Sequence, residues 1–295
     1  MKVLVTGGTG KVGTQVVNAL LSRGASVRVL TRNKEAKVPV GAEVVVGDLL
    51  NPGSVRAALD GADKLFLLAA NAANELTQAL LTFALAREAK VGHLTYLSVY
   101  QAERFPEVPH FIGKHAVETA LKVFDVPFTI LRPGYFFQND AALKAPLTGP
   151  GLYPPPIGTD GIAAVDVRDI AEAAAVSLTT DGHAGKTYGL VGPAPLSGPW
   201  AAAAWAAALG RPVRYAEPSL DAFEEHLRQM VPAWQAMELR LMFQGYQERG
   251  FVPAAADVAA LTTLIGHAPR RYQDFVHETA IAWGITQGRS TADRP

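Results

Sequence analysis

The residues with the clearest chemistry lie near the amino terminus, in the segment Thr6–Gly13 (Thr-Gly-Gly-Thr-Gly-Lys-Val-Gly). Glycine at this spacing allows a tight turn, a close approach of the backbone to a pyrophosphate, and close packing of a helix on a strand. N–H groups at the start of the next helix then hold the phosphates. The alternative is a glycine-rich turn without a ligand. The segment predicts a dinucleotide site, and the residues expected to bind are Gly7, Thr9, Gly10, Lys11, Val12 and Gly13.

The end of the second predicted strand indicates which dinucleotide binds. A carboxylate there would bond the ribose 2′-OH of NAD and repel the 2′-phosphate of NADP. The sequence has no carboxylate before Glu35, and it places Arg32 at the strand end. A guanidinium makes charge-assisted bonds to phosphate, although an ordinary solvated arginine would look the same. NADPH is therefore the predicted cofactor.

Two further strand ends are expected to line the site. Asp48 can accept from the adenine amino group while the N–H of Leu49 meets a ring nitrogen, or Asp48 can cap the helix that follows Pro52. The small residues Ala69 and Ala70 let the backbone pass close to ribose and pyrophosphate, although they also suit plain packing. All four residues are candidates for cofactor binding.

A parallel sheet with helices on both faces would bring these strand ends together. Short apolar runs alternate with helix-like segments over the first 140 residues, which predicts an α/β, doubly wound Rossmann fold. We expect residues 1–140 to form the dinucleotide-binding domain, with 163–180 returning to it, and residues 141–295 to form a smaller, mostly helical C-terminal lobe. The predicted strands are Lys2–Thr6, Ser26–Thr31, Glu43–Val46, Lys64–Ala69, His93–Ser98 and Pro127–Leu131, and the predicted helices are Val12–Arg23, Pro52–Leu59, Asn74–Ala89 and Lys114–Val123.

Composition excludes several other classes of function. The chain has 295 residues, with 27 basic and 27 acidic side chains, so it offers no basic field for nucleic acid. It has no cysteine, which excludes disulfides, thiolate metal sites and cysteine nucleophiles, and its histidines show no ligand spacing. No apolar run reaches the roughly 20 residues that cross a bilayer, so we expect a cytoplasmic protein without a membrane partner.

Taken together, the motifs resemble the NmrA-like group of atypical short-chain dehydrogenases. The resemblance rests on Thr6–Gly13, on Arg32, on Gly47–Asp48 and on Leu131–Asn139 (Leu-Arg-Pro-Gly-Tyr-Phe-Phe-Gln-Asn), and Gly266–Phe275 is similar to the group's closing segment. It covers nearly the whole chain. It implies a Rossmann domain that binds NADPH and a smaller C-terminal lobe. Members include NADPH-dependent quinone reductases, isoflavone-reductase-like enzymes and dinucleotide-binding redox sensors.

The resemblance also implies where catalysis would occur. Ordinary short-chain dehydrogenases use Tyr-x-x-x-Lys on a helix, and this chain has His110 and Lys114 at those positions. Lys114 is then a candidate for catalysis and for holding the nicotinamide ribose. His110 can donate a proton near neutral pH, or it is structural at a helix start after Pro109. Ser98 and Pro133, at neighbouring strand ends, are further candidates for cofactor contact.

Aromatic residues follow the Arg-Pro-Gly run. Tyr135, Phe136 and Phe137 come at the carboxyl end of a predicted strand, the edge at which doubly wound folds bind ligands. Their rings suit a flat substrate such as a quinone, or they pack between the lobes. Tyr100 could supply a phenol, but nothing in the sequence places it. Aromatic and methionine residues after Trp200 can serve the core, a homodimer surface or the pocket.

Three functions compete. The first is an NADPH-dependent reductase of a quinone or similar acceptor, which needs little help from an acid because the hydroquinone anion is stabilised. The second is a non-catalytic NADPH-binding redox sensor, which the missing tyrosine favours. The third, a sugar-nucleotide epimerase or reductase, ranks last because it normally requires Tyr-x-x-x-Lys.

Overall fold

The structure is a computed structural model that describes residues 1–124 and 126–285. The described residues form two compact units. The first comprises residues 1–134, 167–191 and 254–269, without 125, and the second comprises residues 135–166, 192–253 and 270–285. Among the described residues, no helix combines the length and the hydrophobicity that a membrane crossing requires.

The first unit is built on a parallel sheet of seven strands. Their order is β10-β6-β5-β4-β1-β2-β3, so the direction of winding reverses between β1 and β4, as in doubly wound folds. This confirms the predicted fold class. The strands are β1 (Lys2–Thr6), β2 (Ser26–Thr31), β3 (Glu43–Val46), β4 (Lys64–Leu67), β5 (His93–Leu97), β6 (Phe128–Pro133) and β10 (Lys186–Leu190).

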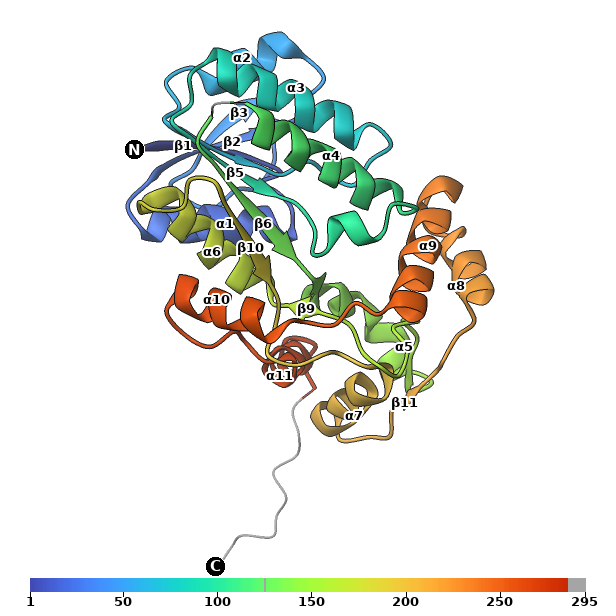
Figure 1. Ribbon diagram of the computed structural model, residues 1–295. Helices are drawn as coiled ribbons and strands as arrows, with labels where there is room; N and C mark the ends of the chain where they lie inside the picture. The colour runs from blue at the N-terminus through green and yellow to red at the C-terminus, as the bar shows by residue number, and fades with distance from the viewer. Residues whose placement is uncertain (125, 286–295) are drawn as a thin grey trace, which may run out of the picture. The chain divides into compact units, whose positions relative to one another are not determined.

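Helices cover both faces of this sheet. Figure 1 shows α2, α3 and α4 on one face and α1 and α6 on the other, while α10 packs against α6 and β10. Helix α1 buries Val12, Val16 and Leu20, which recur every four residues and so share one face. The bounds are α1 (Lys11–Ser22), α2 (Pro52–Leu59), α3 (Glu75–Glu88), α4 (Pro109–Val123), α6 (Val167–Thr179) and α10 (Ala255–Ile265), with a 3-10 turn η1 (Ala102–Arg104).

Three elements differ from the predicted bounds by two residues or more, and α1, α3 and β5 differ by one residue at one end or both. Helix α4 begins at Pro109 rather than Lys114, because proline suits the first turn of a helix. Strand β4 ends at Leu67, and the hydroxyl oxygen of Thr6 accepts from the N–H of Leu68 (2.8 Å). Strand β6 extends to Pro133, since its last two residues pair with β10. All three differences arise from contacts or preferences at an element end.

The second unit is mostly helical. A buried carboxylate organises its core: Asp140 accepts from the phenols of Tyr135 (2.7 Å), Tyr153 (2.8 Å) and Tyr272, and Trp205 donates to the oxygen of Tyr272 (2.9 Å). The elements are β7 (Tyr135–Phe136), the 3-10 helix η2 (Phe137–Leu143), α5 (Lys144–Thr148), β8 (Leu152–Tyr153), β9 (Ala164–Val165), α7 (Gly198–Leu209), β11 (Arg214–Tyr215), α8 (Leu220–Leu227), α9 (Ala233–Arg249) and α11 (Tyr272–Ala282).

Candidate active site

The glycine segment forms the turn between β1 and α1. Gly7 has φ +66°, a left-handed conformation that favours glycine, and its carbonyl accepts from the N–H of Gly10 (3.1 Å). A Cβ on Gly13 would lie 2.1 Å from the carbonyl oxygen of Gly7, so helix and turn pack too closely for any side chain. A Cβ on Gly10 would meet only that oxygen, at 3.4 Å, so the space beside Gly10 is open. The three glycines thus serve three different needs, and Gly10 leaves room for a ligand.

The start of α1 is suited to an anion. Gly10 is the N-cap residue and, having no side chain, makes no side-chain cap bond to the first turn. That turn contains Lys11, Val12 and Gly13 and has no acidic residue. The N–H groups at a helix start and the positive end of the helix dipole together favour a phosphate. The residues present therefore fit the pyrophosphate of a dinucleotide.

A cavity of about 410 Å³ lies beside this turn, at the carboxyl ends of β1 to β4. It brings together six of the predicted cofactor residues, namely Gly7, Thr9, Arg32, Asp48, Leu49 and Ala70. Ala69 is buried next to it, with 3% exposure. Asn74 and Gln78, at the start of α3, also line the cavity and were not predicted, because polar residues at a helix start have several other uses.

Arg32 and Asp48 both line this cavity, and each has side-chain atoms that can still bond to a ligand. Arg32 is exposed, and within residues 1–124 and 126–285 its guanidinium makes no ion pair or hydrogen bond. Asp48 accepts from the N–H of Leu50 (2.8 Å) through Oδ1. The capping role considered for Asp48 belongs instead to Asn51, whose side chain accepts from the N–H of Ser54 (3.1 Å). Helix capping is therefore the role of Asn51, and Asp48 instead stabilises its own turn through the bond from Leu50.

Lys114 lies elsewhere on the same edge of the sheet, outside this cavity. Its Nζ is 2.6 Å from Oε1 of Glu75 and 3.3 Å from the carbonyl oxygen of Leu97, the last residue of β5. Both side chains of the ion pair are about nine-tenths buried. Sequence reasoning missed Glu75. In the sequence, Glu75 is marked only as an acidic residue in the first turn of a helix that follows a strand. Acidic residues are common at that position, so this feature does not indicate a partner.

Ser98, the residue after β5, belongs to a second buried cluster, which is centred on Glu118 of α4. Its hydroxyl donates to Oε1 of Glu118 (2.5 Å), and Arg132 makes two hydrogen bonds to the same carboxylate (2.9 and 2.5 Å). Glu118 is fully buried and one helical turn beyond Lys114. The Ser98 hydroxyl proton is therefore already committed. Sequence reasoning named Arg132 only as part of a motif and missed Glu118.

The two candidate proton donors, His110 and Tyr100, have different contacts. His110 lies in the first turn of α4, and its ring packs edge-on against Phe111 at 4.8 Å between centroids. The Tyr100 hydroxyl donates to Oδ2 of Asp257 (2.8 Å) and accepts from the N–H of Ala254 (3.2 Å). Burial and the bond to Asp257 raise the pKa of the Tyr100 phenol. Tyr100 is thus a poor acid.

The three aromatic residues predicted to line the substrate site, Tyr135, Phe136 and Phe137, differ in their burial within the second unit. The Tyr135 hydroxyl is committed to Asp140, and burial followed by the Asp140 charge raises its pKa well above the usual value. Phe137 is 3% exposed and packs against Tyr272 (5.3 Å between ring centroids), so it belongs to the core. Phe136 stays partly exposed, as does the rest of Tyr135. Pro133, in the first unit, is buried at the end of β6.

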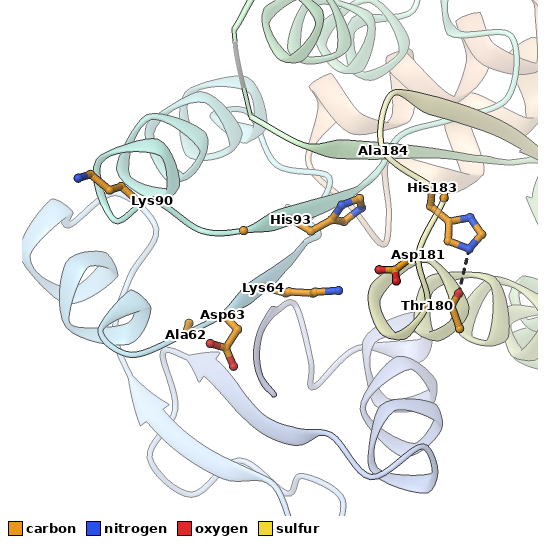
Figure 2. Close-up of a pocket in the computed structure, with 11 residues that line it drawn as sticks. Ala62, Asp63, Lys64, Lys90, His93, Thr180, Asp181, His183 and Ala184 are labelled. Atoms are coloured by element: carbon orange, nitrogen blue, oxygen red, sulfur yellow. Dashed lines mark hydrogen bonds between the residues drawn. The ribbon is translucent and has the colours of Figure 1, made fainter.

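A second cavity, of about 570 Å³, lies at the opposite edge of the sheet, where β4 and β5 begin. Figure 2 shows Lys64, His93 and Asp181 converging there, whereas Lys90 points away. Burial, then the charge of Lys64, lowers the pKa of His93 to about 4, and its Nε2 is hydrogen-bonded to the hydroxyl of Thr129 (2.9 Å). This cavity is separated from the glycine turn by the length of the strands.

Comparison with known proteins agrees with this geometry. The model of the NmrA-like family matches residues 1–268. The chain belongs to the NmrA-like family. The resemblance proposed from the sequence is therefore confirmed, and it extends over both compact units.

Two curated relatives and one solved structure cover nearly the whole chain. An NAD(P)H azoreductase of Xenophilus azovorans is 28% identical over 287 residues, 96% of this chain and 99% of the relative. A (4-alkanoyl-5-oxo-2,5-dihydrofuran-3-yl)methyl phosphate reductase of Streptomyces griseus is 31% identical over 285 residues, 95% and 99% respectively. The NADPH complex of the NADPH-dependent quinone oxidoreductase QOR2 of Escherichia coli is 25% identical, with a TM-score of 0.82 over 94% of this chain and 99% of that one.

Proposed function

We propose that this NmrA-like protein is an NADPH-dependent reductase that delivers hydride to a quinone or another flat, conjugated acceptor. The observation that carries the proposal is the open space beside Gly10 at the start of α1, where a pyrophosphate fits. The names of the relatives support the acceptor class, because azo groups, quinones and acylated 5-oxo-dihydrofurans are all conjugated. Bound NADPH would supply the hydride.

The residues of the first unit divide the work of holding the cofactor. N–H groups of Lys11, Val12 and Gly13 hold the pyrophosphate, with Gly7, Thr9, Ala69 and Ala70 shaping the turn around it. Arg32 pairs with the 2′-phosphate, and Asp48 and Leu49 meet the adenine. Lys114, on α4, contacts the end of β5 and holds the nicotinamide ribose there. Ser98 and Pro133, at the ends of β5 and β6, are further candidates for contact with the cofactor. Tyr135 and Phe136 remain candidates for contact with the acceptor.

Quinone reduction suits a site without a catalytic tyrosine. The negative charge that hydride transfer leaves on a quinone is delocalised over the ring, so water can protonate the product later. A simple aldehyde would form a localised alkoxide and require an acid in the transition state. The Tyr100 proton is held by Asp257, and His110 is the remaining candidate acid. We therefore expect conjugated acceptors to be reduced much faster than simple aldehydes.

The test is steady-state turnover of the purified protein with NADPH and with NADH, using a quinone, an azo dye and a simple aldehyde. We expect quinone or azo reduction, a preference for NADPH, and loss of both in a Gly10→Val control. Robust aldehyde reduction that disappears in His110→Phe would overturn the proposal in favour of a carbonyl reductase with a histidine acid.

A redox sensor is the second candidate, favoured by one observation: His110 stands where a short-chain dehydrogenase has its tyrosine. Tight NADPH binding with no turnover of any acceptor would decide for it.

We also propose that the protein is cytoplasmic and forms a homodimer. A cytoplasmic reductase would draw on the NADPH pool that cell metabolism regenerates. Leu76 and Ile112, exposed on the neighbouring helices α3 and α4, offer an apolar surface for a homodimer. Light scattering on the purified protein tests the assembly, and a monomeric mass at micromolar concentration would contradict it.

A further inference from the structure

Lys114 is one half of a buried ion pair whose other half, Glu75, has no role in the proposed function above. Glu75 is the first residue of α3, and it follows the carboxyl end of β4. Lys114 lies on α4 and contacts the carbonyl of Leu97 at the carboxyl end of β5. The pair thus joins two helices at the edge of the sheet where the glycine turn lies.

The contacts of Lys114 with the protein leave part of its donor capacity unused. An ammonium group has three N–H donors. Oε1 of Glu75 lies 2.6 Å from Nζ as an ion pair, and the carbonyl oxygen of Leu97 accepts one hydrogen bond at 3.3 Å. Nζ also lies 5.8 Å from the centre of the Tyr96 ring. Among residues 1–124 and 126–285, the bond to Leu97 is the hydrogen bond that Nζ makes to protein, which leaves N–H capacity for a ligand.

Glu75 cannot reach a ligand itself. Both of its carboxylate oxygens are covered by protein atoms, and neither has a hydrogen-bond partner among the described residues, so its one close polar contact is the ion pair with Lys114. The neighbouring carboxylate, Glu118, is engaged separately with Arg132 and Ser98. Glu75 is therefore the counter-charge of Lys114 and can act on a ligand only through it.

We propose that Glu75 is a positioning residue, which aims Lys114 at the cofactor and cancels its charge beside the nicotinamide. The inference rests on the proposed function. When the two-electron hydride passes to the acceptor, the nicotinamide ring changes from neutral to cationic, and the acceptor later takes its proton from water. An unpaired ammonium nearby would oppose that new positive charge, whereas a neutral ion pair does not.

The experiment measures the dissociation constants of NADPH and NADP⁺ by calorimetry for the parent and Glu75→Gln. The amide keeps the shape of the side chain and removes its charge. We expect the ratio of the NADP⁺ constant to the NADPH constant to rise about five- to tenfold, because Lys114 is then an uncompensated cation. The matched control is Glu88→Gln at the other end of α3, where an exposed pair with Arg56 undergoes the same chemical change. Its ratio should equal that of the parent.

A second change separates positioning from simple support of the fold. Adding Lys114→Met to Glu75→Gln makes the pair neutral again, so we expect the ratio to return to within about twofold of the parent. If Glu75→Gln does not fold, Lys114→Met alone carries the test. The lone carboxylate should then lower the ratio below that of the parent.

Two results would overturn the inference. One is an unchanged ratio in folded Glu75→Gln, or in Lys114→Met where that variant carries the test. The other is a double variant that keeps the raised ratio of Glu75→Gln. Failure of the proposed function looks different, because the parent itself would then fail to bind NADPH or to turn over any acceptor.

Discussion

Gly10→Val should separate cofactor binding from folding more cleanly than any other single change. Gly10 has φ −86° and ψ 176°, an extended conformation that every residue adopts, so valine introduces no backbone strain. Its Cβ would sit 3.4 Å from the oxygen of Gly7, an acceptable contact, and its methyl groups would extend into the space left for the pyrophosphate. The fold should survive, while phosphate approach is blocked.

The expected magnitudes can be measured by thermal unfolding with and without cofactor. NADPH at a hundred times its dissociation constant stabilises the parent by about 2.7 kcal/mol, which raises Tm by roughly 4–5 °C for a chain of this size. In Gly10→Val that rise should fall below about 1 °C, because affinity drops at least a hundredfold. Without cofactor, the Tm of the variant should lie within about 3 °C of the parent, as for most surface substitutions.

Gly13→Ala provides the contrast. Its Cβ would lie 2.1 Å from the oxygen of Gly7, so the helix and the turn have to separate. We expect it to lower stability by several kcal/mol even without cofactor, as severe overpacking does. The reasoning is refuted if folded Gly10→Val binds NADPH with parental affinity, or if Gly13→Ala is as stable as the parent.

Three other predictions follow from named contacts. Arg32→Ala should weaken NADPH about ten- to a hundredfold and NADH little, as measured by calorimetry, and equal losses would contradict a 2′-phosphate contact. In the folded protein the pKa of His93 is lowered to about 4, from an ordinary value near 6.5, so the unfolded chain takes up the proton first as the pH falls. The free energy of unfolding should therefore drop by up to about 3 kcal/mol between pH 6.5 and pH 4. Urea unfolding should show a flatter pH dependence for His93→Asn, and parallel curves would contradict this assignment. His110→Phe should change kcat for quinone reduction less than threefold, whereas a loss above about a hundredfold would make His110 the obligatory acid.

The parts of this molecule that could be predicted from sequence are those that local rules determine. The glycine spacing predicts a turn because Gly7 needs a left-handed φ and Gly13 cannot carry a Cβ, and both conditions involve residues of one short segment. The strand ends were predictable because parallel strands placed in doubly wound order bring their carboxyl ends to one edge. Arg32 and Asp48 reach the cavity for that reason alone.

The contacts that could not be predicted join distant segments. Tyr100 is held by Asp257, 157 residues away, and its pairing depends on how α10 packs beside β10. Glu75 and Lys114 lie on different helices, and neither residue has a spacing that points to the other. Phe137 follows directly after two half-buried aromatic residues, yet it packs into a core formed with Tyr272. Aromatic residue type alone does not separate a substrate wall from a core.

The loss of the usual tyrosine is easier to understand from the charges around α4. In Tyr-x-x-x-Lys, the lysine acts partly by stabilising a phenolate, and a lysine without that phenol would be an unbalanced buried cation. Here Glu75 supplies the missing negative charge to Lys114, and Glu118 does the same for Arg132. The edge of the sheet can therefore keep its lysine without a phenol at the position of the usual tyrosine. Under the proposed function, this arrangement suits acceptors that stabilise their own negative charge.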